Sequence, residues 1–189
     1  MKILVITEDF TRDQFIVQPL LQAMLKHLGK PHAQITVCKD KAIQGVDQAL
    51  KRTTLQHIFQ RYPMMDLFLL CIDRDGYQER QQSLKKLEDQ AQKPLLTEAA
   101  REEVEVWALA GLELPSQWRW QEIRQEIHPK ECYFQPLAKE RRLANHPAGG
   151  YKQLGQQAAA NYQRIRSLCP EDVGRLETRI QQWMNAPPP

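Results

Sequence analysis

The sequence predicts an α/β fold in which helices flank a parallel sheet, followed by a helical C-terminal part. Two observations support this prediction. Short runs of β-forming residues alternate with longer segments of helical periodicity through the first half of the chain. One run, at residues 67–72, is apolar throughout, which is typical of a parallel strand buried on both faces. Because strands and helices alternate, successive strands should lie parallel with helices on the faces of the sheet.

The elements follow from these patterns in order. Strands are expected at residues 2–6, 35–38, 67–72 and, as a short strand that runs into a helix, within 98–109. Helices are expected at about residues 11–28, 45–61, 77–92, 151–166 and 171–183. The first helix should begin at Thr11, because Thr11 and Gln14 have the spacing of a capping box. The segment 114–136 is expected to be irregular.

The chain is expected to form one domain over residues 1–185. Its α/β core should span 1–112, and a mixed, mainly helical extension should span 113–185. A length of 189 residues with 42% hydrophobic residues suits a single folded domain. The closing Ala-Pro-Pro-Pro, residues 186–189, is expected to be a disordered tail.

The protein is expected to be cytoplasmic, with reduced thiols and no membrane partner. Its first apolar run gives way at Thr7 to polar residues, which is too soon for a secretory signal. No apolar stretch approaches the length of a membrane span. The four cysteines include no CxxC pair.

Acidic residues follow two of the expected strands. Glu8 comes after the first strand, and Asp73 and Asp75 come at the end of the third. Open α/β sheets bind ligands at the carboxyl ends of their strands, so these carboxylates should meet if the two strands are neighbours. Carboxylates held together need protons or a cation, and Mg²⁺ or Mn²⁺ suits an all-oxygen site. Asp75, which precedes Gly76, fits a turn-forming role equally well.

This ordered set of acids resembles the TOPRIM fold of topoisomerases, primases and overcoming-lysogenization-defect nucleases. The closest likeness is to small bacterial TOPRIM-like proteins, in which a leading Glu, an Asp-x-Asp and a later Glu-x-Trp recur in that order. The matching positions here are Glu8, Asp73 with Asp75, and Glu105-Val106-Trp107. The segments Gly149-Gly150-Tyr151-Lys152 and Cys169-Pro170 are also similar to that group.

The resemblance implies a TOPRIM/Rossmann-like sheet and roles for individual residues. Asp73 and Asp75 would bind Mg²⁺, and Glu8 would join the metal site or act as a general acid or base. Glu105 is a candidate further ligand, or alternatively a polar residue at the start of an apolar helix. In one departure from the family pattern, no glycine closely follows the leading Glu, since the chain reads Glu8-Asp9-Phe10-Thr11.

Basic residues concentrate in the C-terminal half. Between positions 131 and 167 the chain has six Lys and Arg residues against two Glu, a local net charge of +4, whereas the whole chain carries +3. Cations beside an acidic metal site suit a phosphodiester substrate. Lys139, Arg142 and Lys152 are the candidate phosphate contacts, although for any single one of them a solvated helix face is the more common role.

Three functions are compatible with these features. The first is a Mg²⁺-dependent nuclease or related phosphodiesterase that acts on nucleic acid, in a bacterial defence system. The second is a receiver-like domain in which Asp73 accepts a phosphoryl group. The third is a non-enzymatic TOPRIM-like module that binds metal or other protein subunits, which fits the missing glycine.

Overall fold

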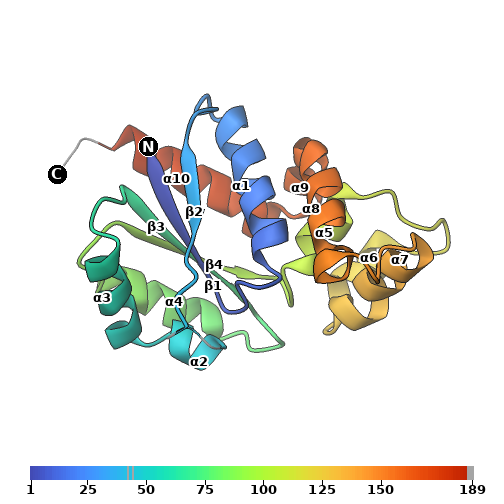
Figure 1. The fold of residues 1–189 in the computed structure, drawn as a ribbon, viewed down its shortest axis with the longest axis horizontal. Helices are drawn as coiled ribbons and strands as arrows, with labels where there is room; N and C mark the ends of the chain where they lie inside the picture. The colour runs from blue at the N-terminus through green and yellow to red at the C-terminus, as the bar shows by residue number, and fades with distance from the viewer. Residues whose placement is uncertain (42, 44, 187–189) are drawn as a thin grey trace.

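The computed structural model describes residues 1–41, 43 and 45–186. It contains a four-stranded, all-parallel sheet in the order β2-β1-β3-β4 (Figure 1). The strands are β1 (Lys2–Thr7), β2 (Gln34–Val37), β3 (Leu67–Asp73) and β4 (Leu95–Ala100). The predicted fold, an α/β protein with a parallel sheet and a helical C-terminal part, is therefore confirmed. β1 and β3 are the two central strands, so both are covered on their two faces.

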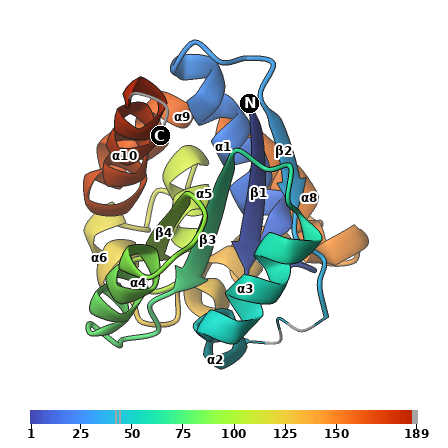
Figure 2. The same cartoon turned by 90° about the vertical axis from the view of Figure 1, so that its left-hand side faces the viewer.

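Alternate residues of the central strands enter two separate cores. Ile3 and Val5 of β1 face one core, and Leu4 and Ile6 face the other. The second core is covered by α2 (Val46–Ala49), α3 (Arg52–Arg61) and α4 (Arg80–Asp89). The first core is covered by α1 (Gln14–His27), α5 (Glu105–Gly111) and the helices of the C-terminal half. Figure 2 shows α3 and α4 in front of the sheet and α1 behind it.

The C-terminal half packs against the sheet rather than standing apart. Its elements are α6 (Trp120–Gln125), a π-helical turn (Lys130–Phe134), α7 (Gln135–Glu140), a 3₁₀ turn (Pro147–Gly150), α8 (Tyr151–Ala160), α9 (Tyr162–Leu168), a second π-helical turn (Pro170–Gly174) and α10 (Arg175–Asn185). Side chains from α8, α9 and α10 belong to the same buried core as β1 and α1. In Figure 1 the strands point toward the part of the molecule that holds α5 to α9, whereas α10 packs on the same face of the sheet as α1.

A close approach between α8 and α1 depends on one glycine. A Cβ atom at Gly155 would lie 1.9 Å from the backbone oxygen of Phe15. No other residue fits at that distance, so Gly155 allows α8 to pack directly on the first turn of α1. This contact places the helical half beside the carboxyl edge of the sheet.

Several element boundaries differ from those expected. The first helix begins at Gln14, because Thr11 lies in a preceding turn where its N–H donates to Asp9 Oδ1 at 2.9 Å. The helix expected at 45–61 divides into α2 and α3, and the one expected at 151–166 divides at Asn161. The expectation of an irregular segment at 114–136 was wrong, since it contains α6 and a π-helical turn.

The predicted disordered tail falls almost entirely outside the described residues. Ala186 is exposed and follows the end of α10, and residues 187–189 are not described. No helix in the described part of the chain is both long enough and apolar enough to cross a membrane.

Candidate metal centre

The predicted acids do meet at the carboxyl edge of the sheet. Asp73 is the last residue of β3, and Glu8 follows β1, the strand that pairs with β3. Both side chains line an open pocket of about 680 Å³. The rest of its lining is Asp9, Phe10, Thr11, Asp13, Lys41, Ile43, Gly45 and Lys130.

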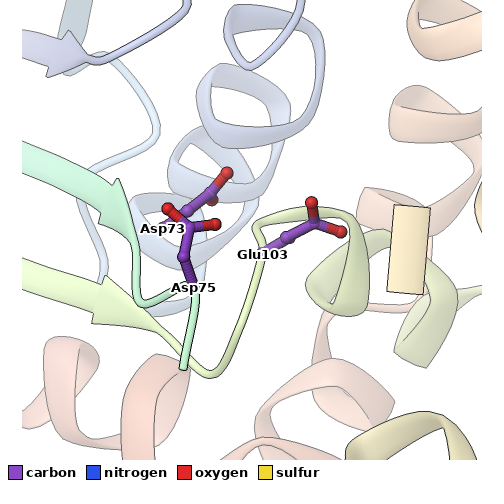
Figure 3. Close-up of side chains that lie close together, drawn as sticks. All are labelled: Asp73, Asp75 and Glu103. Carbon is purple, nitrogen blue, oxygen red and sulfur yellow. The ribbon is translucent and has the colours of Figure 1, made fainter. Parts of the chain in front are cut away.

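Three carboxylates in this region are close enough to share one ion. Oxygen atoms of Asp73, Asp75 and Glu103 all lie within 4.8 Å of one another. Figure 3 shows Asp73 and Asp75 at the end of β3, with Glu103 approaching from the turn between β4 and α5. Asp73 and Asp75 were the predicted pair, whereas Glu103 was missed. It lies only two residues before the predicted ligand Glu105, and the local sequence Glu-Glu-Val-Glu does not show which acid faces the site.

Glu102 holds the loop that carries Asp75. The backbone N–H groups of Arg74 and Asp75 donate to the Glu102 backbone oxygen at 2.7 Å and 3.1 Å. The N–H of Gly76 donates to Glu102 Oε2 at 2.6 Å, and the Arg74 guanidinium contacts Glu102 Oε1. Arg74 is therefore tied to a buried carboxylate.

Asp75 combines the two roles considered for it. Its φ of 46° lies in the left-handed region, followed by Gly76 at 76°, so the residue does form a turn. Its carboxylate nevertheless belongs to the group of three. Arg80 Nη1 donates to Asp75 Oδ2 at 2.5 Å and to the backbone oxygen of Asp73 at 2.7 Å, which fixes both residues.

Glu8 lies against Asp73 rather than within the group of three. Its Oε1 accepts the backbone N–H of Asp73 at 3.1 Å. Burial raises the pKa of Glu8, and repulsion from Asp75 raises it further. A partly buried carboxyl with a raised pKa at the wall of a pocket is a candidate for general acid–base chemistry.

The carboxylates around the pocket disfavour one another's ionised forms. Burial, with the charges of Glu105 and Glu8, raises the pKa of Asp73 well above its usual value. Burial and the charge of Glu105 raise the pKa of Asp13 to about 8. Burial is also the main reason why the pKa of Glu103 rises to about 7. A bound cation would relieve this repulsion.

The structure does not bring Glu105 into the group of three. It is the first residue of α5 and is buried, as its alternative role at a helix start predicts. The Tyr151 hydroxyl donates to Glu105 Oε1, and Lys130 Nζ lies 3.8 Å from the same oxygen. Among the described residues, Glu105 Oε2 has no hydrogen-bond partner.

The predicted phosphate contacts lie outside the pocket. Lys139, Arg142 and Lys152 are exposed on the helical half, and none of them lines the pocket. Lys152 instead borders a separate hollow beside His146. The lysines that line the pocket are Lys41 and Lys130, which the sequence analysis did not single out because both lie outside the basic stretch between positions 131 and 167.

Comparisons with protein-family models, with curated proteins and with solved structures found no significant match to this chain. The resemblance to TOPRIM-like proteins therefore remains a prediction that rests on the residues quoted above.

Proposed function

We propose that this protein binds a divalent cation, Mg²⁺ or Mn²⁺, and hydrolyses phosphodiester bonds in nucleic acid. One observation carries the proposal: three carboxylates, from the end of β3 with its following loop and from the turn before α5, converge within 4.8 Å at the carboxyl edge of a parallel sheet. Hard divalent cations favour all-oxygen sites of this kind.

The hydrogen bonds around Asp73, Asp75 and Glu103 suit metal ligands. Asp73 Oδ1 accepts the N–H of Val104 at 2.9 Å, and Glu103 Oε2 accepts the N–H of Lys130 at 2.8 Å. Asp75 Oδ2 accepts from Arg80. These bonds orient the carboxylates, and among the described residues Asp75 Oδ1 and Glu103 Oε1 accept no hydrogen bond. The cation would act as a Lewis acid and lower the pKa of a bound water.

The chain's own groups account for the remaining chemistry. Glu8 lines the same pocket and is the candidate general acid or base. Lys139, Arg142 and Lys152 remain candidate contacts for more distant phosphates of a long substrate, since all three are exposed on the helical half beyond the pocket. A nucleic acid would suit this arrangement, because its scissile phosphate could occupy the pocket while neighbouring phosphates contact the exposed basic residues.

A non-enzymatic role is the second candidate, and Arg80 favours it. Its guanidinium already supplies a positive charge to Asp75, with only 12% of the Arg80 side chain exposed. Such an ion pair can hold the loop without any metal, which suits a module that recruits other protein subunits. The receiver-like alternative stays a prediction, to be tested by phosphate incorporation at Asp73 from an acyl-phosphate donor.

Calorimetric titration with Mg²⁺ and Mn²⁺ tests the proposal directly. Wild type is compared with Asp73→Asn, which keeps the shape of the side chain, and with Asp89→Asn as control, an exposed acid on α4 outside the pocket. We expect Asp73→Asn alone to lose binding. Equal binding by all three proteins would overturn the metal site.

Cleavage is measured on labelled single-stranded DNA, double-stranded DNA and RNA with each cation. The proposal expects cleavage of at least one substrate by wild type and none by Asp73→Asn. Cation binding without cleavage of any of them would favour the non-enzymatic module.

A further inference from the structure

Lys130 brings a positive charge from the helical half into the acidic pocket. It begins the π-helical turn Lys130–Phe134 and lines the pocket together with Glu8 and Asp73. Its side chain is 23% exposed, so it is largely enclosed yet accessible from solvent. Its amine lies beside the buried carboxylate of Glu105, a partner that favours the charged form of a lysine.

Both ends of this residue are fixed. Its backbone N–H donates to Glu103 Oε2 at 2.8 Å, and its Nζ lies 3.8 Å from Glu105 Oε1. Glu105 is itself buried and accepts the Tyr151 hydroxyl. The backbone of Lys130 thus orients Glu103, a member of the group of three carboxylates, while its amine lies beside the buried carboxylate of Glu105. The fold therefore sets both positions.

We propose that Lys130 is the phosphate-binding residue of this pocket, with Glu105 and Tyr151 positioning its amine; this rests on the proposed phosphodiesterase function. An anion entering a pocket lined by Glu8, Asp13 and Asp73 meets unfavourable charge unless cations outweigh it. Lys130 supplies one such cation from a largely enclosed position, in addition to the exposed Lys41, and a divalent ion at the group of three carboxylates would supply positive charge on the other side. A phosphoryl group placed between them would receive charge on two sides, which selects phosphate esters over neutral ligands.

The alternative is that Lys130 only neutralises the surrounding acids. The two roles make opposite predictions for Lys130→Met, which keeps the length of the side chain without its charge. A purely neutralising lysine competes with Mg²⁺, so its loss would raise Mg²⁺ affinity and leave phosphate binding unchanged. A phosphate-binding lysine, once lost, would weaken phosphate binding while Mg²⁺ affinity does not fall.

The test is calorimetric titration of the full chain with inorganic phosphate, at a saturating Mg²⁺ concentration and again with a chelator. The proteins are wild type, Lys130→Met, Lys130→Arg and a control, Lys93→Met, which replaces an exposed lysine just before β4 at the opposite edge of the sheet. We expect Lys130→Met to lose about tenfold or more in phosphate affinity, the value of a hydrogen bond to a charged group. Lys130→Arg should stay within about threefold of wild type, and Lys93→Met should equal it.

A measurement on wild type covers the case in which Lys130→Met does not fold. The NMR signal of the Lys130 side chain, assigned as the one missing from Lys130→Arg, should shift when phosphate is added. Unchanged phosphate affinity in folded Lys130→Met, a static lysine signal, or no phosphate binding by wild type would each overturn the inference. Mg²⁺ binding is titrated separately: its absence together with Lys130-dependent phosphate binding would defeat the proposed metal site and leave this inference standing.

Discussion

The backbone N–H of Asp73 donates a hydrogen bond to Glu8 Oε1 at 3.1 Å. The paired register of β1 and β3 ends before this point, at Thr7 and Cys71. The bond therefore extends the contact between the central strands beyond their ladder and holds the Glu8 carboxylate at the wall of the pocket. Because Oε1 already accepts this hydrogen bond, Oε2 is the oxygen left for either of the two roles considered for Glu8, metal ligand or general acid or base.

Glu8→Gln tests whether Glu8 acts in proton transfer or as a ligand. The amide oxygen can accept the same N–H, so the local geometry should persist, but the side chain no longer ionises. We expect Mg²⁺ affinity within about threefold of wild type and a cleavage rate lower by about 100-fold or more. The measurements are calorimetry and single-turnover kinetics. A matching loss of Mg²⁺ binding would instead make Glu8 a metal ligand, as the resemblance also allows.

The pair Glu103→Gln and Glu105→Gln tests which of these neighbouring acids binds the cation. Glu103 lies in the group of three, whereas Glu105 contacts Tyr151 and Lys130. We expect Glu103→Gln to weaken Mg²⁺ binding about tenfold or more and Glu105→Gln to change it by less than about threefold. The reverse order of effects in calorimetry would restore Glu105 as the ligand and remove Glu103.

Glu102→Ala tests the support of the loop that carries Asp75. The substitution removes the acceptor for the Gly76 N–H and the partner of the Arg74 guanidinium. We expect a loss of about 1–3 kcal/mol in the free energy of unfolding, because a partly buried charged group is left unpaired. The amide hydrogen of Gly76 should also exchange faster, because it loses its side-chain acceptor. Unaltered exchange would show that the turn is held without Glu102.

The stability of the metal-free protein should depend on pH. Burial raises the pKa of Asp13 to about 8 and the pKa values of Glu98 and Glu103 to about 7, all above their unfolded values near 4. The folded state then holds more protons than the unfolded state between these limits. The free energy of unfolding is therefore greatest below about pH 4 as far as these groups are concerned, and falls as pH rises toward 8.

Urea denaturation at pH 5 and pH 8 in a chelator measures this slope. Asp13→Asn should be more stable than wild type at pH 8 by at least about 1.4 kcal/mol, the value of one pKa unit. At pH 8, added Mg²⁺ should raise the free energy of unfolding of the wild-type protein, because the cation binds only the folded site. A flat profile for wild type would contradict the raised pKa values of these buried acids.

The sequence by itself determined the fold class and the position of two site residues. Apolar runs such as 67–72 reveal strands because burial on both faces demands uninterrupted apolar side chains. Asp73 and Asp75 could be placed at the carboxyl edge because they directly follow such a run, so strand direction alone locates them. Helix boundaries were less predictable: Thr11 has the spacing of a cap, yet its side chain and N–H contact Asp9 within a turn.

Only the tertiary structure decided the rest of the site. Glu102, Glu103 and Glu105 are close in sequence but point to a loop, to the group of three carboxylates and to a buried tyrosine, respectively. Their directions depend on where β4 ends and α5 begins. Glu102 also has a left-handed φ of 65°, which the local sequence does not predict. Lys130 reaches the pocket because the helical half packs on α1 through Gly155. Such contacts join residues far apart in the chain, and their geometry comes from packing rather than from periodicity.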